Sequence, residues 1–507
     1  MALINSVITW IIKKRIHQMD LFMKYPHDVQ EEWFKKLIQS GRETEYGKRF
    51  GFDDIKNYEQ FRQRVPVNNY SSLKPYIDRL RKGEQDLLWP SDIKWFAKSS
   101  GTTAGKSKYI PVSRHAMEEC HFKGGKDMLS IYVNNHPDTL IFDGRSIGMG
   151  GSHNISDVNN EEYYDGDLSA ILIENLPFWA QILRTPNREI TLMDEWESKI
   201  EQMARITMEE NVTSLSGVPS WTLLLVKRIL EITGEESIKT IWPNLEVFIH
   251  GGIKLEPYRK QFDKLVGPGG INYQETYNAS EGFFGIQDRS DSKELLLMLD
   301  YGVFYEFIPM TEIDKEEPKV YHLSEVRKGE NYAMLITTNA GLWRYKIGDT
   351  VQFTSISPYR ILITGRTKYF INLVGEEIIL DNAEKALEIA CKKCDAIVDE
   401  YMAGPADVEK GEDARHEWLF EFVKKPKDIS VFGDALDNAL KSLNSDYEAK
   451  RYKNMLLQPP LIRELQNGTF YAWLKKKGKL GGQHKVPRLL NQRTILEEVL
   501  KIYYEKS

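Results

Sequence analysis

The sequence predicts a mixed α/β protein, with a large N-terminal domain of α/β layers that includes a β-barrel-like part, and a smaller α+β C-terminal domain. A chain of 507 residues is too long for a single hydrophobic core, so two or three domains are expected. Helical and strand patterns alternate at first, and strand patterns dominate from 294 to 364, which resembles a barrel or a distorted sheet. We therefore expect domains of residues 1–366 and 367–507, joined by a hinge near Thr367.

The first part of the chain combines helices with a strand that leads into a loop. Apolar residues at helical spacing predict helices over 19–45 and 57–82. Pro26 and Pro66 should break them, because proline cannot continue a helix interior. Alternating side chains predict a strand over 92–98, directly before a loop rich in Ser, Thr and Gly. A helix over 114–133 and an extended segment over 139–150 are expected next.

The later elements follow from the same two periodicities. They are a helix over 223–232, a short buried strand over 246–250, the strands of 294–364, a helix over 380–392, a strand over 417–423 and a helix over 433–444. A polar acidic stretch covers 404–415, and a basic loop covers 475–485. This order makes the C-terminal part a small α+β unit.

Composition and charge exclude several classes of protein. The net charge of -6 gives no reason to expect a nucleic-acid partner. The chain has three cysteines, too few for a disulfide framework, which indicates a reducing compartment. Cys391 and Cys394 form a C-x-x-C pair without a second Cys or His pair at zinc spacing, so a bound metal is not expected there.

The N-terminal segment 1–19 contains an apolar run followed by Lys13, Lys14 and Arg15. This is the wrong order for a signal peptide, and the run is too short to span a membrane. We expect an amphipathic helix packed on the domain rather than a membrane anchor, and a cytoplasmic protein.

The loop after the first strand, Ser99 to Lys108, is one residue away from a nucleotide-triphosphatase P-loop. A P-loop needs a helix to begin at its Gly-Lys-Ser, but strand formers and Pro111 follow here. The loop therefore joins two strands. It still suits phosphate, since small residues let the backbone approach and hydroxyls donate, whereas the alternative is an ordinary polar hairpin turn. The candidate phosphate contacts are Ser99, Ser100, Gly101, Thr102, Thr103 and Lys106, and Lys108 is the alternative to Lys106 as counter-charge.

Several motifs resemble those of one family. The loop is similar to the phosphate loop of adenylate-forming enzymes, the group of acyl-CoA synthetases and luciferases. Tyr277–Gly282 resembles the Y-x-S-S-E motif of plant auxin-responsive acyl acid–amido synthetases, the Gretchen Hagen family. His250–Gly252 stands at that family's S-G-G turn, and Trp343–Asp349 resembles its Y-R-x-G-D segment. The segments 217–221 and 483–488 also look like family signatures, and the resemblance covers nearly the whole chain in order.

The resemblance implies that ATP adenylates a carboxylic acid, pyrophosphate leaves, and an amino acid amine takes the acyl group. By this resemblance Glu281 binds Mg²⁺, Asp349 accepts hydrogen bonds from the ribose hydroxyls, and Lys485 supplies a positive charge in the active site. Lys479 is the alternative lysine, and each of these side chains could instead be an ordinary solvated group. The remaining nucleotide contacts that it implies are Tyr277 beside adenine, Gly251 and Gly252 along it, Ser280, and Arg366 on ribose or phosphate.

Two rival functions stay open. One is an acyl-CoA-type ligase with a thiol acceptor, and the other is a nucleotide-binding protein without turnover. The hinge segment 365–376 resembles that of the wider adenylating group and departs from the plant enzymes, which leaves the acceptor open. By resemblance, the acyl pocket draws on 114–133, 163–170 and 217–225, whose Met and aromatic residues suggest an apolar or aromatic acid.

Overall fold

The structure is a computed structural model of the 507-residue chain. It describes residues 15–506 except 100–107, 253–254, 314, 316, 367–369, 372, 374–375, 377, 408–413, 445–446, 449–450, 452–453, 455–456 and 479–484. The phosphate-loop candidates Ser100, Gly101, Thr102, Thr103 and Lys106, the hinge at Thr367 and Lys479 all fall outside the described residues.

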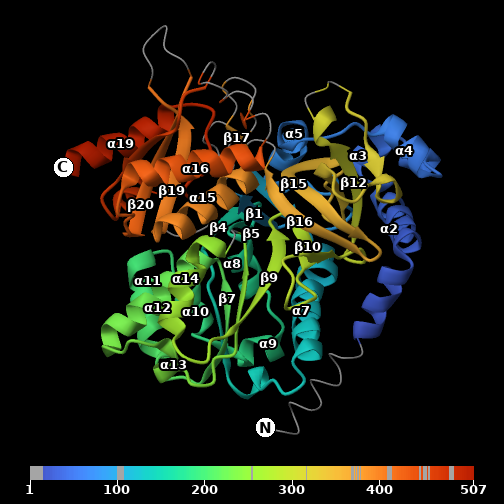
Figure 1. Cartoon of the computed structure of the whole chain (residues 1–507). Coiled ribbons are helices and arrows are strands. Elements are labelled where there is room, and N and C mark those ends of the chain that lie inside the picture. The colour runs from blue at the N-terminus through green and yellow to red at the C-terminus, as the bar shows by residue number, and fades with distance from the viewer. Residues whose placement is uncertain are drawn as a thin grey trace.

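A 12-stranded mixed sheet runs through the large N-terminal part (Figure 1). Its order is β13-β12-β14-β15-β16-β11-β10-β9-β8-β7-β3-β6. The strands β6, β3, β7, β8 and β9 pair in parallel, and the others pair antiparallel. The bounds are β3 Arg145–Gly148, β6 Arg184–Thr185, β7 Val212–Gly217, β8 Val247–Gly251, β9 Asn272–Ala279, β10 Gly282–Ile286, β11 Leu295–Leu297, β12 Val303–Pro309, β13 Tyr321–His322, β14 Asn331–Thr338, β15 Tyr345–Ile356 and β16 Tyr359–Arg366.

The dense β region of the sequence forms the antiparallel half of this sheet, with register shifts in the β14–β15 and β15–β16 pairs. A shift of this kind bends a strand and increases its twist. The sequence predicted either a barrel or a distorted sheet for 294–364, and the structure has the distorted sheet, which stays open at β13.

A second sheet of four strands, in the order β2-β1-β5-β4, carries the predicted strand–loop–strand unit. Strand β1 (Trp95–Ser99) pairs antiparallel with β2 (Lys108–Val112), and Ser99 is opposite Lys108. Strand β2 follows the loop directly and the next helix begins only at Arg114, so the structural context differs from that of a P-loop, as predicted. The other strands are β4 His153–Val158 and β5 Glu161–Gly166.

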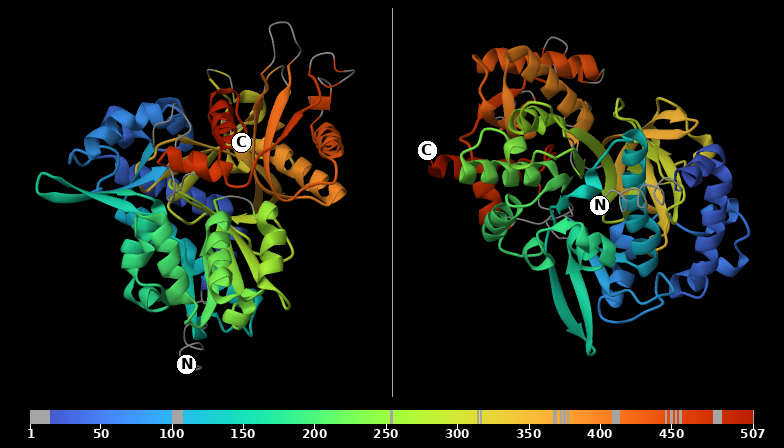
Figure 2. Two further views of the ribbon diagram at one scale, coloured as in Figure 1. Left: turned by 90° about the vertical axis from the view of Figure 1, so that its left-hand side faces the viewer. Right: turned by 90° about the horizontal axis from the view of Figure 1, so that it is seen from below.

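Helices cover both halves of the large sheet (Figures 1 and 2). The predicted proline breaks are confirmed: α2 begins at Pro26, and Pro66 lies between α4 and α5. The 139–150 segment is extended only over β3, because a 3₁₀ turn occupies Ile141–Asp143. The helix bounds are α2 Pro26–Gly41, α3 Glu45–Arg49, α4 Tyr58–Arg64, α5 Tyr70–Leu80, α6 Arg114–Ala116, α7 Phe122–Asn135, α8 Leu168–Glu174, α9 Phe178–Ile182, α10 Arg188–Thr191, α11 Trp196–Thr207, α12 Pro219–Thr233, α13 Ile238–Ile241 and α14 Glu256–Val266.

The chain near its N-terminus is fastened to the large part by charge. A helix covers 15–24, and Arg15 at its start donates to Asp127 at 2.8 Å and to Asp300 at 2.7 Å. This agrees with a helix packed on the domain, although residues 1–14 are outside the described part. Within that part, every helix is too short or too polar to cross a membrane.

The C-terminal part has its own hydrophobic cores around a three-stranded sheet, in the order β19-β20-β21. Helix α16 begins at Ile429, earlier than the predicted 433, because the Asp428 side chain accepts from Ser430 N and caps it. The bounds are β17 Phe370–Ile371, β18 Ile378–Ile379, α15 Leu380–Cys394, β19 Ile397–Pro405, β20 His416–Lys424, α16 Ile429–Leu443, β21 Leu461–Glu464, α18 Thr469–Lys476 and α19 Thr494–Lys506.

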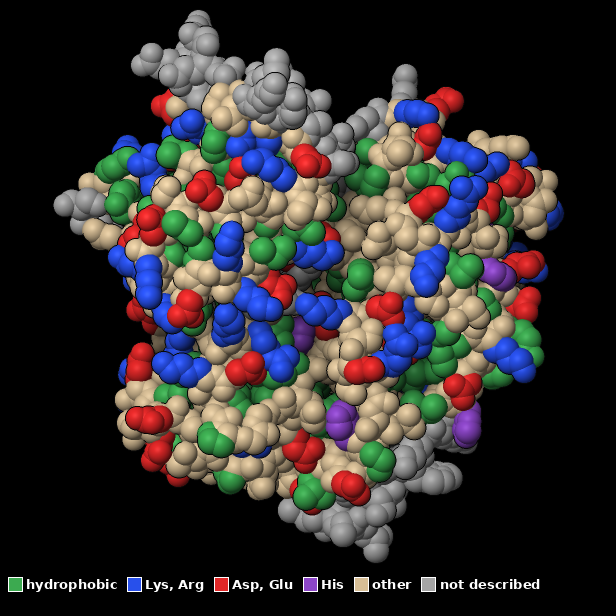
Figure 3. All heavy atoms as spheres, viewed as in Figure 1, with side chains coloured by type: hydrophobic (Ala, Val, Ile, Leu, Met, Phe, Trp, Pro, Cys, Tyr) green, Lys and Arg blue, Asp and Glu red, His purple; other side chains and the backbone are tan. Residues whose placement is uncertain are grey.

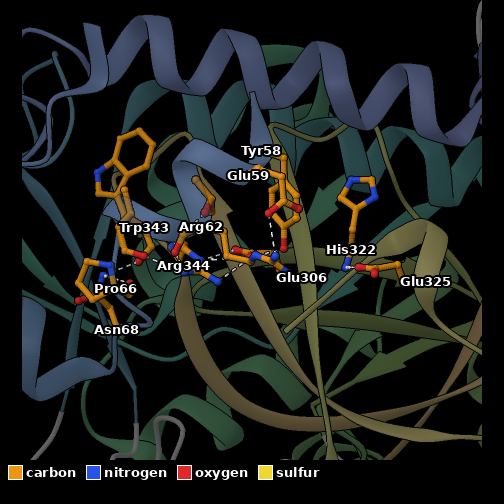
Figure 4. A network of polar contacts seen from close by, with 12 residues as sticks. Tyr58, Glu59, Arg62, Pro66, Asn68, Glu306, His322, Glu325, Trp343 and Arg344 are labelled. Carbon is orange, nitrogen blue, oxygen red and sulfur yellow. Dashed lines mark hydrogen bonds and ion pairs between the residues drawn. The ribbon is translucent and has the colours of Figure 1, made fainter. Parts of the chain in front are cut away.

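A buried ion pair joins the N-terminal helices to the antiparallel strands (Figure 4). Arg344 Nη2 and Nε donate to the two oxygens of Glu306 on β12 at 2.9 and 3.0 Å, and both side chains are at most 3% exposed. Arg344 Nη1 also donates to the Val65 carbonyl at 2.7 Å. Tyr58 donates its hydroxyl to the same carboxylate at 2.9 Å. Every charged group in this pair is hydrogen-bonded, as burial requires.

We expect Glu306→Gln to destabilise the large part strongly, because it leaves the Arg344 guanidinium buried without its counter-charge. Breaking one partner of a buried pair costs about 3–5 kcal/mol in free energy of unfolding. Thermal melting and chemical denaturation measure the loss. The matched control is Glu312→Gln, whose pair with Lys315 lies on the surface and should not affect the melting temperature. Equal melting temperatures for both variants would contradict this role.

Candidate active site

The predicted site residues lie at the carboxyl ends of the parallel strands β8 and β9. Gly251 ends β8, and Ser280 and Glu281 form the turn that follows β9. In α/β sheets ligands bind outside the carboxyl ends of the strands. Residues that are far apart in the sequence therefore meet at one edge of the sheet.

Tyr277 and Asp349 form the central contact of this site. The Tyr277 hydroxyl on β9 donates to Asp349 Oδ2 on β15 at 2.6 Å, and both side chains are buried. The Tyr277 ring also packs edge-on against Phe284, with ring centroids 5.0 Å apart. The bond holds the Asp349 carboxylate in one orientation, which is what bidentate recognition of two ribose hydroxyls requires.

Asp349 is also the direct cross-strand neighbour of Arg366. Their Cα atoms pair in the antiparallel register of β15 with β16. The two residues proposed to contact the ribose thus lie opposite each other on neighbouring strands, at the end of the large part. Gly348, just before Asp349, has φ +96, a backbone conformation that side chains other than glycine's rarely adopt.

The turn after β9 buries a carboxylate. Glu281 is 7% exposed and Ser280 is 6% exposed. A surface glutamate, the alternative raised by the sequence, would be solvated, and Glu281 is not. The described residues contain no group of three or more His, Cys, Asp or Glu poised for a metal. One buried carboxylate nevertheless fits Mg²⁺, which binds through one or two carboxylates plus substrate phosphates.

Lys485 brings the C-terminal part to this edge. Its Nζ donates to the carbonyl of Gly252, in the turn after β8. Gly252 has φ +79, and a Cβ there would lie 3.1 Å from Lys485 Nζ. The glycine therefore suits both the turn and the approach of the lysine. Nearby, Arg488 donates to the Tyr258 hydroxyl at 3.0 Å, a second contact between the two parts.

Three domain models of one family match the chain in order. The GH3 family N-terminal domain matches residues 15–270, the central domain 296–366 and the C-terminal domain 381–494. The chain belongs to the GH3 family. The resemblance read from the sequence motifs is thereby confirmed.

The GH3 relatives are amide-forming ligases. Indole-3-acetic acid-amido synthetase GH3.3 of Arabidopsis thaliana is 24% identical, with 92% of this chain and 90% of that protein covered. Jasmonoyl--L-amino acid synthetase GH3.5 of Oryza sativa subsp. japonica is 23% identical, with 94% and 95% covered. This GH3 chain is thus an enzyme of the class that forms a carbon–nitrogen bond.

Solved structures share the fold of this GH3 chain. A GH3.15 acyl acid amido synthetase superposes with a TM-score of 0.80 at 18% identity, with 97% of this chain and 96% of the other covered. A 2-hydroxyisobutyryl-CoA ligase in its postadenylation state gives 0.60 at 11% identity, with 94% and 91% covered. The predicted fold class is confirmed: mixed α/β, with a large N-terminal and a smaller C-terminal domain, as in adenylate-forming enzymes.

The sequence analysis missed one contact of the Tyr277 motif. His121 Nδ1 lies 3.1 Å from Asn278 Oδ1, and burial lowers the pKa of His121 to about 4. The imidazole is therefore neutral and donates to the amide oxygen. His121 ends a π-helical turn, Met117–His121, between α6 and α7. Such turns are frequent at functional sites, but helical periodicity over 114–133 carries no signal for one.

We expect Tyr277→Phe to weaken ATP use, because Asp349 loses the hydroxyl that orients it. A hydrogen bond to a charged group contributes roughly 1.5–3 kcal/mol, so KM for ATP should rise about 10- to 100-fold. Steady-state kinetics measure it. Tyr273→Phe is the control, since that hydroxyl on the same strand donates to the exposed Asp263 at 3.0 Å. An equal KM in the two variants would contradict the role.

Proposed function

We propose that this GH3 chain adenylates a carboxylic acid with ATP and then transfers the acyl group to the amine of an amino acid. The observation that supports the proposal is that the Tyr277 hydroxyl on β9 donates to Asp349, while Lys485 contacts Gly252 just after the neighbouring strand β8. Its relatives carry names for this type of product, an acid joined to an amino acid.

The chemistry has two steps in one place. The carboxylate oxygen attacks the α-phosphorus of ATP, the bond to the β-phosphate oxygen breaks, and pyrophosphate leaves. The amine then attacks the acyl carbon, AMP leaves with the bond electrons, and the amine loses a proton. Both steps develop negative charge that fixed donors and cations stabilise.

The residue roles are proposed from their positions. Asp349, oriented by Tyr277, takes the ribose hydroxyls. Lys485 neutralises charge between the carboxylate and the α-phosphate. Glu281 would hold Mg²⁺, whose charge offsets that of the phosphates. The remaining proposed ATP contacts are Ser99, Ser100, Gly101, Thr102, Thr103 and Lys106 in and around the hairpin loop, Gly251, Gly252, Ser280 and Arg366.

The acyl pocket is proposed to adjoin these residues. Val218, in the segment 217–225, lies 3.7 Å from a Cβ built on Gly252. Tyr163, by contrast, is only 3% exposed and its hydroxyl accepts from Gln85, and Tyr164 stacks on Trp95 at 3.9 Å. Both tyrosines thus have partners within the fold. A cytoplasmic location is also proposed, since the cysteines are free thiols.

We expect acid-dependent exchange of labelled pyrophosphate into ATP with a panel of carboxylic acids, and its loss when Mg²⁺ is chelated. Exchange requires a reversible adenylation, so a protein that only binds nucleotide gives none. Release of AMP with amino acids, compared with CoA, then separates the amide product from a thioester. If none of the acids in the panel supports exchange, the proposal is overturned. If AMP is released with CoA but not with amino acids, the acceptor is a thiol rather than an amine.

We expect Lys485→Ala to depress exchange about 100-fold or more, as loss of a charge-stabilising donor does. If the C-terminal part rotates between the two steps, the variant should still pass pre-formed acyl-AMP to the amine at the wild-type rate. Lys477→Ala is the control, because Lys477 pairs with Glu498 on the surface. If Lys479→Ala, rather than Lys485→Ala, loses only adenylation, Lys479 is the active-site lysine. If Lys485→Ala slows both steps equally, Lys485 does not act in adenylation alone.

A further inference from the structure

Arg184 lies at the end of the large sheet, and no carboxylate of the described residues pairs with it. It begins β6, the last strand after β3. Its Nη2 donates to the Gly148 carbonyl at 3.3 Å, and among the described residues it has no ion pair. One weak bond uses one of five guanidinium donors.

Other arginines that this fold buries are compensated. Arg15, Arg344, Arg360 and Arg451 each contact an aspartate or glutamate at 2.9 Å or less. Burial without such a partner lowers the pKa of Arg184 to about 10, although an arginine of that pKa is still charged at neutral pH. An uncompensated charge in a partly buried place costs stability, which an anionic ligand can offset.

The backbone around Arg184 leaves space for the guanidinium. A Cβ at Gly148 would lie 2.9 Å from Arg184 Nη2, so glycine lets the group approach the carboxyl end of β3. The same virtual atom would lie 3.4 Å from Ser216 Oγ on β7. Arg184 therefore faces the strand ends that lead toward the site, rather than the opposite end of the sheet.

The position is within reach of the reacting groups. Gly148 pairs with Ser216, and Ser216 pairs with Ile249 on β8, which ends at Gly251. Two strand spacings of about 4.8 Å and three residues of about 3.3 Å along β8 place the turn that Lys485 contacts roughly 14 Å from the carboxyl end of β3, where the guanidinium lies. That span suits the far end of a small substrate bound across the strand ends.

We propose that Arg184 binds a substrate carboxylate other than the one that is adenylated. This inference rests on the proposed function and adds a second anion subsite to it. The carboxylate can belong to the amino acid acceptor or to an acyl acid with two carboxyl groups. A planar guanidinium suits either one, because it donates to both oxygens of a carboxylate at once.

Kinetics with neutral analogues distinguish the two sources. In amide formation, each accepted amino acid is compared with its carboxamide, and in pyrophosphate exchange a dicarboxylic acid is compared with its monoester. We expect Arg184→Gln to raise KM for the charged member of one pair about 10- to 100-fold, and to leave the neutral member unchanged. Arg184→Lys, which keeps the charge but not the planar fork, should fall between.

Arg188→Gln is the matched control, since Arg188 lies on the next helix and pairs with Glu174 on the surface. A wild type without preference for the charged member in either pair would overturn the inference, as would equal effects of Arg184→Gln on charged and neutral members. Thermal stabilisation of the wild type by succinate against succinamide gives a readout without turnover. If no acid supports pyrophosphate exchange, the proposed function fails but this binding test can still be made. Equal thermal stabilisation by succinate and succinamide would overturn the anion subsite.

Discussion

The buried pair of Arg344 and Glu306 fixes where the strand that carries Asp349 begins. Arg344 has φ +43 and sits five residues before Asp349, so the strand that carries Asp349 starts from a restrained position. Asn68 reinforces it, because its backbone N donates to the Arg344 carbonyl and its carbonyl accepts from Lys346 N, each at 2.8 Å. The N-terminal helices, distant in sequence, thereby set the geometry of the β15 strand. On this strand Asp349 meets the Tyr277 hydroxyl.

Local chemistry is what the sequence could predict. Pro26 begins one helix and Pro66 separates two others, although Pro75 lies inside α5, and the strand formers after the Gly-Lys-Ser exclude a helix without any tertiary information. Spaced motifs also identified the family and placed Asp349 and Lys485 as candidates. These features depend on a few neighbouring residues or on a pattern shared across the chain.

Contacts between distant segments were beyond sequence reasoning. The His121–Asn278 bond joins residues 157 apart, and the Arg344–Glu306 pair needs the order β12-β14-β15. Arg184 reads as an ordinary polar residue of a short strand, and only the packing shows that no carboxylate among the described residues meets it. A missing partner is a property of the assembled fold, and no spacing encodes it.

Among the described residues, several polar contacts join the two parts of the molecule. Lys and Arg side chains gather along this junction (Figure 3), and α14 and the end of α15 carry Arg259, Lys260, Lys264, Lys392 and Lys393. Across it, Glu197 accepts from the Tyr471 hydroxyl at 2.9 Å and from Lys475 at 3.1 Å, and all three side chains are exposed. Dissolved ions screen exposed charges over about 8 Å at physiological concentration. A higher salt concentration therefore weakens these exposed contacts, and the medium itself helps to set how firmly the C-terminal part is held against the large part.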